Sequence, residues 1–329
     1  MNRFGILLIV IIVFSFSISA FAQDEAEIRV DSAIVRVNVG VVDRRGRPIT
    51  SLNQNNFSLF EDGVKQEITR FETTVSPFSV VLLLDMSGST QTFRQNIRLS
   101  ASRFLDALAP DDRIAVVEFY SKINLLNDFT TNRKTAANSI QVANGRGPTE
   151  LYKALDFALE KLSRENSRRK AIVVLTDGID TKVQDDDRRF LAKLSDEDIS
   201  SAITPENNDT LNAVLNRADV QGVTIYPLAL PTGDPARLPD PTPKQVALFK
   251  AARERLGIIA ARTGGTLNTI NKLEEMGRLY AEVAADIRTL YTIEYQPSNL
   301  TRDGKWRAIK IELNNPSLIP RSKQGYFAK

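Results

Sequence analysis

The sequence predicts an α/β fold, in which a doubly wound, mostly parallel sheet is joined by a small β-sandwich made from the N- and C-terminal segments. Two observations support this prediction: apolar strand-like runs alternate with amphipathic helical stretches in the middle of the chain, and both ends show period-two alternation. The 329 residues are enough for one large domain and one smaller one. We expect a signal peptide at 1–22, sandwich segments at 23–76 and 290–329, and the α/β domain at 77–289.

The middle of the chain carries the signals of a buried parallel sheet. Its continuous apolar runs are typical of strands buried on both faces, and lie at 79–84, 114–117, 171–175 and 223–230. Amphipathic helices are predicted at 93–108, 151–162, 211–218, 245–261 and 273–287. The run at 123–129 is expected to form an antiparallel edge strand.

The two ends of the chain read as β-structure. Apolar and other residues alternate over 33–41, and short apolar runs follow at 57–60 and 68–71. Near the other end, 290–295 reads as a strand and 305–313 alternates again. Since about fifty residues alone bury little core, we expect both ends to join in one sandwich. The alternative is two separate β appendages.

The first residues have the pattern of an export signal. Arg3 precedes an almost wholly apolar stretch at 4–21, and Ala20-Phe21-Ala22 offers small residues at the two positions that a signal peptidase reads. Cleavage before Gln23 would leave an exported protein without a membrane span, in the periplasm or outside the cell. The alternative is an uncleaved anchor, because the apolar run is nearly long enough to cross a bilayer.

Composition narrows the chemistry. The 43 basic and 40 acidic residues give a net charge of only +3, and no concentrated Lys/Arg stripe indicates nucleic-acid binding. The chain has no Cys and no His, which excludes thiolate and imidazole chemistry and the corresponding zinc or copper sites. A bound metal must therefore be a hard cation held by oxygen atoms.

Hydroxyl and carboxylate residues follow the predicted strands at three places. Asp85 ends the first strand of the sheet and opens the segment Asp85-Met86-Ser87-Gly88-Ser89. Thr149 ends the loop 145–149 before a helix, and Thr176-Asp177-Gly178 closes the run at 171–175. In doubly wound sheets, ligands collect at the carboxyl ends of the strands, so these residues form a candidate metal site.

These three pieces, in this order, resemble the metal-ion-dependent adhesion site (MIDAS) of the von Willebrand factor type A family. The resemblance covers about two thirds of the chain, and all five ligand positions match. Weaker motifs outside the site are similar to bacterial "VWFA-related domain" proteins, and lie at 43–48, 56–57, 60–63 and 325–327.

The resemblance implies a set of ligands and a function. The hydroxyls of Ser87, Ser89 and Thr149 would bind Mg²⁺ (or Mn²⁺ or Ca²⁺), with Asp85 and Asp177 acting largely through waters. The ion would then accept an Asp or Glu of a partner protein, in an adhesion module that is not an enzyme. Glycines at 88, 145 and 147 would let the chain curl around the ion and let the Thr149 loop shift.

The same residues allow other interpretations. Ser and Asp after strands also cap helices without metal. Asp85 after an apolar strand is similar to the nucleophile of haloacid dehalogenase-like phosphatases, but Ser87 stands where their second Asp would be. No Gly-x-Ser-x-Gly elbow or P-loop is present. An envelope assembly or scaffold subunit, or a metal-dependent hydrolase, is the alternative function.

Two long segments follow the strands that end near the candidate site. We expect loops at 180–208, which contains three consecutive Asp at 185–187, and at 231–243, which is rich in proline. Because both leave the carboxyl ends of parallel strands, we expect them to border the metal and to select the partner.

Overall fold

The computed structural model describes residues 34–73, 76–165, 168–195, 198–199, 202–237 and 239–328. The expected signal peptide at 1–22 lies outside these residues. In the described part of the chain, no helix combines the length and apolar character needed to cross a membrane.

A six-stranded sheet forms the centre of the α/β part, with the strand order β10-β9-β8-β5-β6-β7. Its strands are β5 (Phe78–Asp85), β6 (Arg113–Phe119), β7 (Ile123–Thr130), β8 (Arg169–Thr176), β9 (Thr224–Ala229) and β10 (Asn268–Thr269). All neighbours pair in parallel except β7, which is antiparallel to β6 at the edge. The predicted antiparallel edge strand is therefore confirmed.

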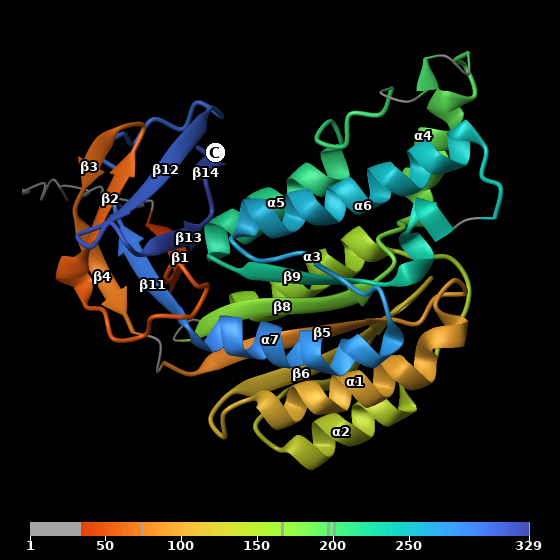
Figure 1. Ribbon diagram of the computed structural model, residues 1–329, viewed down its shortest axis with the longest axis horizontal. Coiled ribbons are helices and arrows are strands. Elements are labelled where there is room, and N and C mark those ends of the chain that lie inside the picture. Colours follow the sequence, from red (N-terminus) through yellow and green to blue (C-terminus); the bar gives the residue numbers. More distant parts are fainter. Residues whose placement is uncertain are drawn as a thin grey trace, which may run out of the picture. The chain divides into compact units, whose positions relative to one another are not determined.

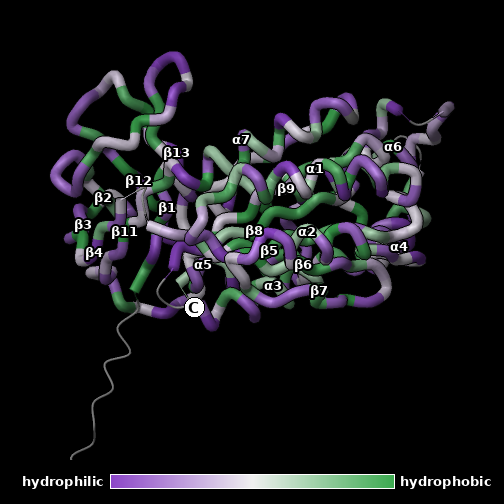
Figure 2. The backbone as a smooth tube through the Cα atoms, turned by 90° about the horizontal axis from the view of Figure 1, so that it is seen from below, coloured by the Kyte–Doolittle hydropathy of each residue, from purple (hydrophilic) through white to green (hydrophobic). Residues whose placement is uncertain are grey.

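Helices cover both faces of this sheet (Figure 1). They are α1 (Arg94–Ala107), α2 (Arg133–Val142), α3 (Leu151–Ser163), α4 (Thr181–Leu191), α5 (Asp209–Gln221), α6 (Pro243–Thr263) and α7 (Met276–Arg288). One core joins α1, α2 and α7 to one face, and a second core joins α3, α5 and α6 to the other. Every residue of β5 and β8 is buried, and these strands run through the hydrophobic interior in Figure 2.

The ends of the chain form two antiparallel sheets, with the orders β13-β1-β11-β4 and β14-β12-β2-β3. Their strands are β1 (Val35–Val42), β2 (Phe57–Glu61), β3 (Val64–Gln66), β4 (Ile68–Glu72), β11 (Leu290–Tyr295), β12 (Trp306–Leu313), β13 (Ile319–Ser322) and β14 (Gly325–Phe327). N-terminal β1 pairs with C-terminal β11, and β2 pairs with β12. Alternate residues of both sheets point into one shared apolar core, so the fold class predicted from the sequence is confirmed.

The expected loop at 180–208 is wrong in its first part, because residues 181–191 form α4. Asp180 caps this helix by accepting a hydrogen bond from the Val183 N–H, at 3.2 Å. The consecutive Asp residues are paired one turn away: Asp185 with Arg188, and Asp186 with Arg189. Asp185 and Asp186 therefore lie on the solvated face of a helix, whereas Asp187 forms a buried ion pair with Arg255 of α6, at 2.6 Å.

The second expected loop, at 231–243, contains two short 3₁₀ turns, Pro231–Gly233 and Pro235–Arg237. Pro243 occupies the first turn of α6, so that helix begins two residues earlier than predicted. Helix α2 was also missed. It is capped by Asn132, whose side chain accepts hydrogen bonds from two backbone N–H groups, but it buries few apolar residues and so has a weak periodic signal.

Candidate metal centre

The candidate site lies where the strand order reverses. Strands β5 and β8 are neighbours, yet α1 after β5 packs on one face of the sheet and α4 after β8 contributes Val183 to the core of the other. The loops that leave the two strands therefore diverge and leave a crevice between their carboxyl ends. Asp85 is the last residue of β5, and Asp177 directly follows β8.

The carboxylate of Asp85 is fully buried and held by two donors. The Ser87 N–H donates to Oδ1 at 3.0 Å, and the Thr176 hydroxyl donates to Oδ2 at 2.7 Å. The Thr90 hydroxyl donates to the Asp85 carbonyl oxygen at 2.8 Å, which closes the Asp85–Thr90 turn. Burial, followed by the charge of Asp177, raises the pKa of Asp85 to about 7.

The carboxylate of Asp177 is also fully buried, but one of its oxygens is unsatisfied. Oδ1 accepts the Ile179 N–H at 3.1 Å, whereas Oδ2 has no hydrogen-bond partner among the described residues. Burial raises the pKa of Asp177, and the Ser89 hydroxyl and the Ile179 N–H oppose that rise. A buried carboxylate oxygen without a donor is costly unless a cation or a water completes its environment.

The other proposed ligands come from two loops that are joined by their backbones. The Ser87 and Ser89 hydroxyls lie 3.1 Å apart, with Ser87 buried and Ser89 exposed. The Gly88 N–H donates to the Gly147 carbonyl oxygen at 3.0 Å, so the loop after β5 touches the loop that carries Thr149.

Thr149 is the candidate ligand whose side chain makes no hydrogen bond to the other four. It is buried and anchored to the first turn of α4, where its N–H donates to the Thr181 hydroxyl and its carbonyl oxygen accepts the Thr181 N–H. Ser89 and Thr149 nevertheless line one cavity of about 410 Å³, so both border the same open space.

Arg94 links these two loops by hydrogen bonds, a role that was not predicted from the sequence. The Arg94 guanidinium donates to the Met86 carbonyl oxygen at 3.2 Å, to the Gly145 carbonyl oxygen and to the Asn144 side chain at 2.7 Å. Glu118 holds the same segment by accepting the Asn144 N–H at 2.6 Å. No motif contains Arg94, and its main partners are backbone carbonyl groups, so the sequence carries no signal for this role.

The glycine at 145 has a different role from the one expected. A Cβ at this position would lie 2.2 Å from the Tyr120 ring, so Gly145 is needed for close packing and does not loosen the loop. Gly147 has a positive φ of 101°, which favours glycine.

The segment after β9 packs against the candidate site. A Cβ at Gly233 would lie 2.0 Å from the Asp177 carbonyl oxygen, so this 3₁₀ turn lies directly on the Asp177 backbone. Arg253 of α6 donates to the Leu230 carbonyl oxygen at 3.1 Å, and its charge acts on Asp177 to lower the pKa of that carboxyl.

The donor set fits a hard cation. The two carboxylates and the three hydroxyls supply oxygen ligands of the kind that Mg²⁺ and Ca²⁺ prefer, and the adjoining cavity has room for water ligands. Within the described residues, no cluster of three or more Asp, Glu, His or Cys side chains could hold a metal, so any site here depends on the hydroxyls. The unsatisfied Oδ2 of Asp177 is the structural observation that such an ion would resolve.

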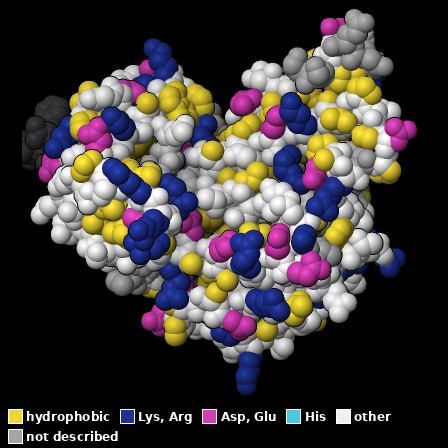
Figure 3. All heavy atoms as spheres, in the orientation of Figure 1, with side chains coloured by type: hydrophobic (Ala, Val, Ile, Leu, Met, Phe, Trp, Pro, Cys, Tyr) yellow, Lys and Arg dark blue, Asp and Glu magenta, His cyan; other side chains and the backbone are white. Residues whose placement is uncertain are grey.

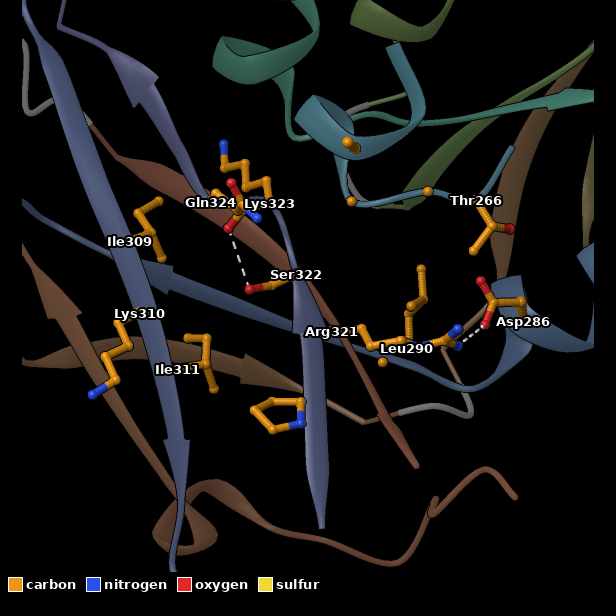
Figure 4. A pocket seen from close by; sticks show the side chains of 15 residues that line it. Thr266, Asp286, Leu290, Ile309, Lys310, Ile311, Arg321, Ser322, Lys323 and Gln324 are labelled. Atoms are coloured by element: carbon orange, nitrogen blue, oxygen red, sulfur yellow. Dashed lines mark hydrogen bonds and ion pairs between the residues drawn. The ribbon is translucent and has the colours of Figure 1, made fainter. Parts of the chain in front are cut away.

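A second cavity, of about 390 Å³, lies among the end of α6, α7 and strands β12 and β13 (Figure 4). Asp286 and Arg321 point toward one another there and form an ion pair of 2.7 Å. Because these charges are paired, we assign the cavity no ligand. On the face of the molecule seen in Figure 3, basic and acidic side chains are interspersed.

Residues 80–179 match the family model of the von Willebrand factor type A domain, and this range contains all five candidate ligands. No curated protein matches the chain. The α/β part therefore has a von Willebrand factor type A-like fold, with additional antiparallel sheets formed by the two ends of the chain.

Several solved structures are similar in part. The vWF domain of the type V pili tip protein Mfa5 from Porphyromonas gingivalis has 17% identity and a TM-score of 0.48, over 64% of this chain and 95% of that one. A von Willebrand factor type A protein from Catenulispora acidiphila has 14% identity and a TM-score of 0.48, over 92% of this chain and 64% of that one. Proximal thread matrix protein 1 from the mussel byssus, with a zinc-occupied MIDAS motif, has 14% identity and a TM-score of 0.47, over 68% and 49% of the two chains.

Proposed function

We propose that this protein is an exported binding module that uses a divalent cation to capture an acidic side chain of a partner protein. The matched family consists mostly of non-enzymatic interaction modules, which supports binding as the general activity. The proposal adds the metal, its ligands and the class of partner, and it assigns the site no catalytic step.

The observation that carries the proposal is the pair of buried carboxylates at the switch point. Asp85 and Asp177 are both fully buried, Asp177 Oδ2 lacks a partner, and the two charges act on each other. Two like charges in a low-dielectric crevice are unfavourable without a counter-charge. A divalent cation beside them supplies that charge.

We assign Mg²⁺ as the cation, with Mn²⁺ or Ca²⁺ as substitutes. The hydroxyls of Ser87, Ser89 and Thr149 would bind it, and Asp85 and Asp177 would act largely through waters. Neutral hydroxyl ligands leave most of the ionic charge available, so the bound ion offers an open position to a carboxylate oxygen of the partner. Ser89 is exposed, which supports an open position that faces solvent.

We also propose export, with cleavage of the signal peptide before Gln23. The support lies in the sequence: Arg3, the apolar stretch at 4–21 and the small residues Ala20 and Ala22. The partner would then be met in the periplasm or outside the cell. N-terminal sequencing of the exported protein tests this directly, since a retained Met1 would contradict cleavage.

Calorimetric titration of the full chain with MgCl₂ tests the metal proposal. We expect saturable binding to the wild type and its loss in Ser87→Ala and Asp177→Asn. Ser139→Ala is a matched control, because Ser139 is also buried but lies in α2, away from the crevice. Binding that is equal in the wild type and in Asp177→Asn would overturn the assignment.

A further inference from the structure

The cavity that borders Ser89 and Thr149 extends between α4 and α6, which pack side by side (Figure 1). We call it the α4–α6 trough: its walls are the Thr149 loop, α4 with Gln184 and, in its last turn, Arg188, and the first turns of α6 with Gln245. None of the described residues that line it is acidic. One cavity therefore borders both the proposed metal and a set of polar side chains that the metal does not use.

These polar side chains present hydrogen-bond donors. The Gln245 side-chain oxygen accepts from the Thr242 N–H at 2.9 Å in the capping box of α6, which leaves its amide NH₂ group unused. The Gln184 side-chain oxygen accepts from Arg188 at 3.2 Å, which again leaves the NH₂ group. No described residue accepts a hydrogen bond from either NH₂ group.

Two further groups in the trough can donate. The Arg188 guanidinium carries five N–H donors, and the structure uses it only for Asp185 and Gln184. The Thr181 hydroxyl accepts the Thr149 N–H, so its own hydrogen remains available. The rest of the lining is apolar and includes Leu248 and Phe249.

We propose that the α4–α6 trough binds a second acidic side chain of the same partner segment whose first acidic side chain reaches the metal. This inference rests on the proposed function and adds the chemistry of the partner. No acidic side chain lines the trough, so its donors favour a carboxylate, and Arg188, whose guanidinium also pairs with Asp185, can add a charge-assisted hydrogen bond. Leu248 and Phe249 would contact the aliphatic part of that segment. A partner with a single acidic residue would leave these donors unpaired.

The test uses a displayed library of random peptides, selected on the full chain in MgCl₂ and released with EDTA. We expect the wild type to enrich peptides that carry two acidic residues. In Gln245→Glu, the new side chain keeps the capping oxygen but places a negative charge in the trough, so capture of the two-acid peptides should fall about tenfold. Arg188→Ala should reduce their capture in the same direction without adding a charge.

Gln141→Glu is the matched control, because it makes the same change on the exposed surface of α2 and should leave capture unchanged. Magnesium-dependent enrichment of single-acid peptides, captured equally by Gln245→Glu, would overturn the trough but leave the metal function intact. The absence of magnesium-dependent enrichment in the wild type would overturn both.

Discussion

Two of the regions that bury carboxylates surround them differently. Asp219, between α5 and α6, has the Arg262 guanidinium at 2.7 Å and the Lys323 amine at 3.9 Å. Asp85 and Asp177, at the ends of β5 and β8, have no described Lys or Arg nitrogen within 4.0 Å of their carboxylates. Asp219 therefore has basic side chains beside it, whereas the Asp85–Asp177 pair has no basic side chain in contact.

The pKa shifts reflect this difference. Burial raises the pKa of Asp219, but Lys323 and Arg262 both act to lower it. Burial raises the pKa of Asp85 to about 7, and there the neighbouring Asp177 adds to the rise. A buried carboxylate with internal counter-ions is structural, and a buried pair without them is suited to an external cation.

The largest expected effect comes from breaking the internally compensated region. Arg262→Ala removes the closest counter-ion of Asp219 and also the guanidinium that lies against the rings of Trp306 and Phe327. We expect the free energy of unfolding to fall by about 3 kcal/mol, measured by urea denaturation, with no dependence on metal.

Arg164→Ala is the matched control for this change. Its partner Glu160 and Arg164 itself are mostly exposed, so the same substitution should cost less than about 1 kcal/mol. An equal loss in both variants would contradict the distinction between the two kinds of ion pair.

The second region should respond with the opposite sign. In EDTA, Asp177→Asn removes one of two buried charges that raise each other's energy and have no counter-ion in contact, and it removes the carboxylate oxygen that has no partner. We expect the metal-free protein to become more stable by about 1–3 kcal/mol in urea denaturation, while magnesium binding is lost. A loss of stability in EDTA would show that the pair is already compensated within the chain.

The metal-free wild type should also depend on pH in a defined direction. Because the folded pKa of Asp85 is raised from 3.8 to about 7, the folded state binds more protons than the unfolded state between these values. This group therefore makes the protein less stable as pH rises through that window, by about 1.4 kcal/mol for each pH unit well inside it. Urea denaturation in EDTA across this range measures the slope, and saturating MgCl₂ should remove it. A contribution that rises with pH would contradict the raised pKa.

The smallest expected effect concerns the residue that joins the two ligand loops. Arg94→Ala removes hydrogen bonds to the Met86 and Gly145 carbonyl oxygens, so the loops of Ser89 and Thr149 are held together less firmly and keep the Gly88–Gly147 hydrogen bond. We expect magnesium affinity to fall about tenfold in calorimetry, with Arg94→Lys recovering part of it. Arg103→Ala on the same helix is the control; equal affinity in the Arg94→Ala and Arg103→Ala variants would exclude a positioning role.

Much of the fold could be predicted because burial patterns are local. The eight residues of β5 are all buried, and the apolar run 80–84 within them identifies both the strand and its end at Asp85. The placement of Asp85 and Asp177 at neighbouring strand ends then follows from the parallel arrangement. The alternation in the last part of the chain likewise predicted that β12 has one buried face, whereas β1 is buried along most of its length because it lies between two other strands.

Other features depend on contacts that no local pattern records. The three consecutive Asp residues of α4 were predicted to lie in a loop. Their ion pairs with Arg188, Arg189 and, on α6, Arg255 depend on the helix being formed, so the sequence alone does not indicate them. Two partners of Arg94 are backbone carbonyl groups 8 and 51 residues away, so residue type gives no indication of them. The trough combines side chains from three separate segments for the same reason.

The stability of the full chain as a function of magnesium concentration tests most directly whether the buried pair needs an external cation. A ligand that binds only the folded state raises the free energy of unfolding with the logarithm of its concentration above its Kd. We expect this rise for the wild type and no rise for the Asp85→Asn/Asp177→Asn double variant, whose charges are gone. A wild-type free energy of unfolding that does not change with MgCl₂, or that rises equally in the double variant, would contradict it.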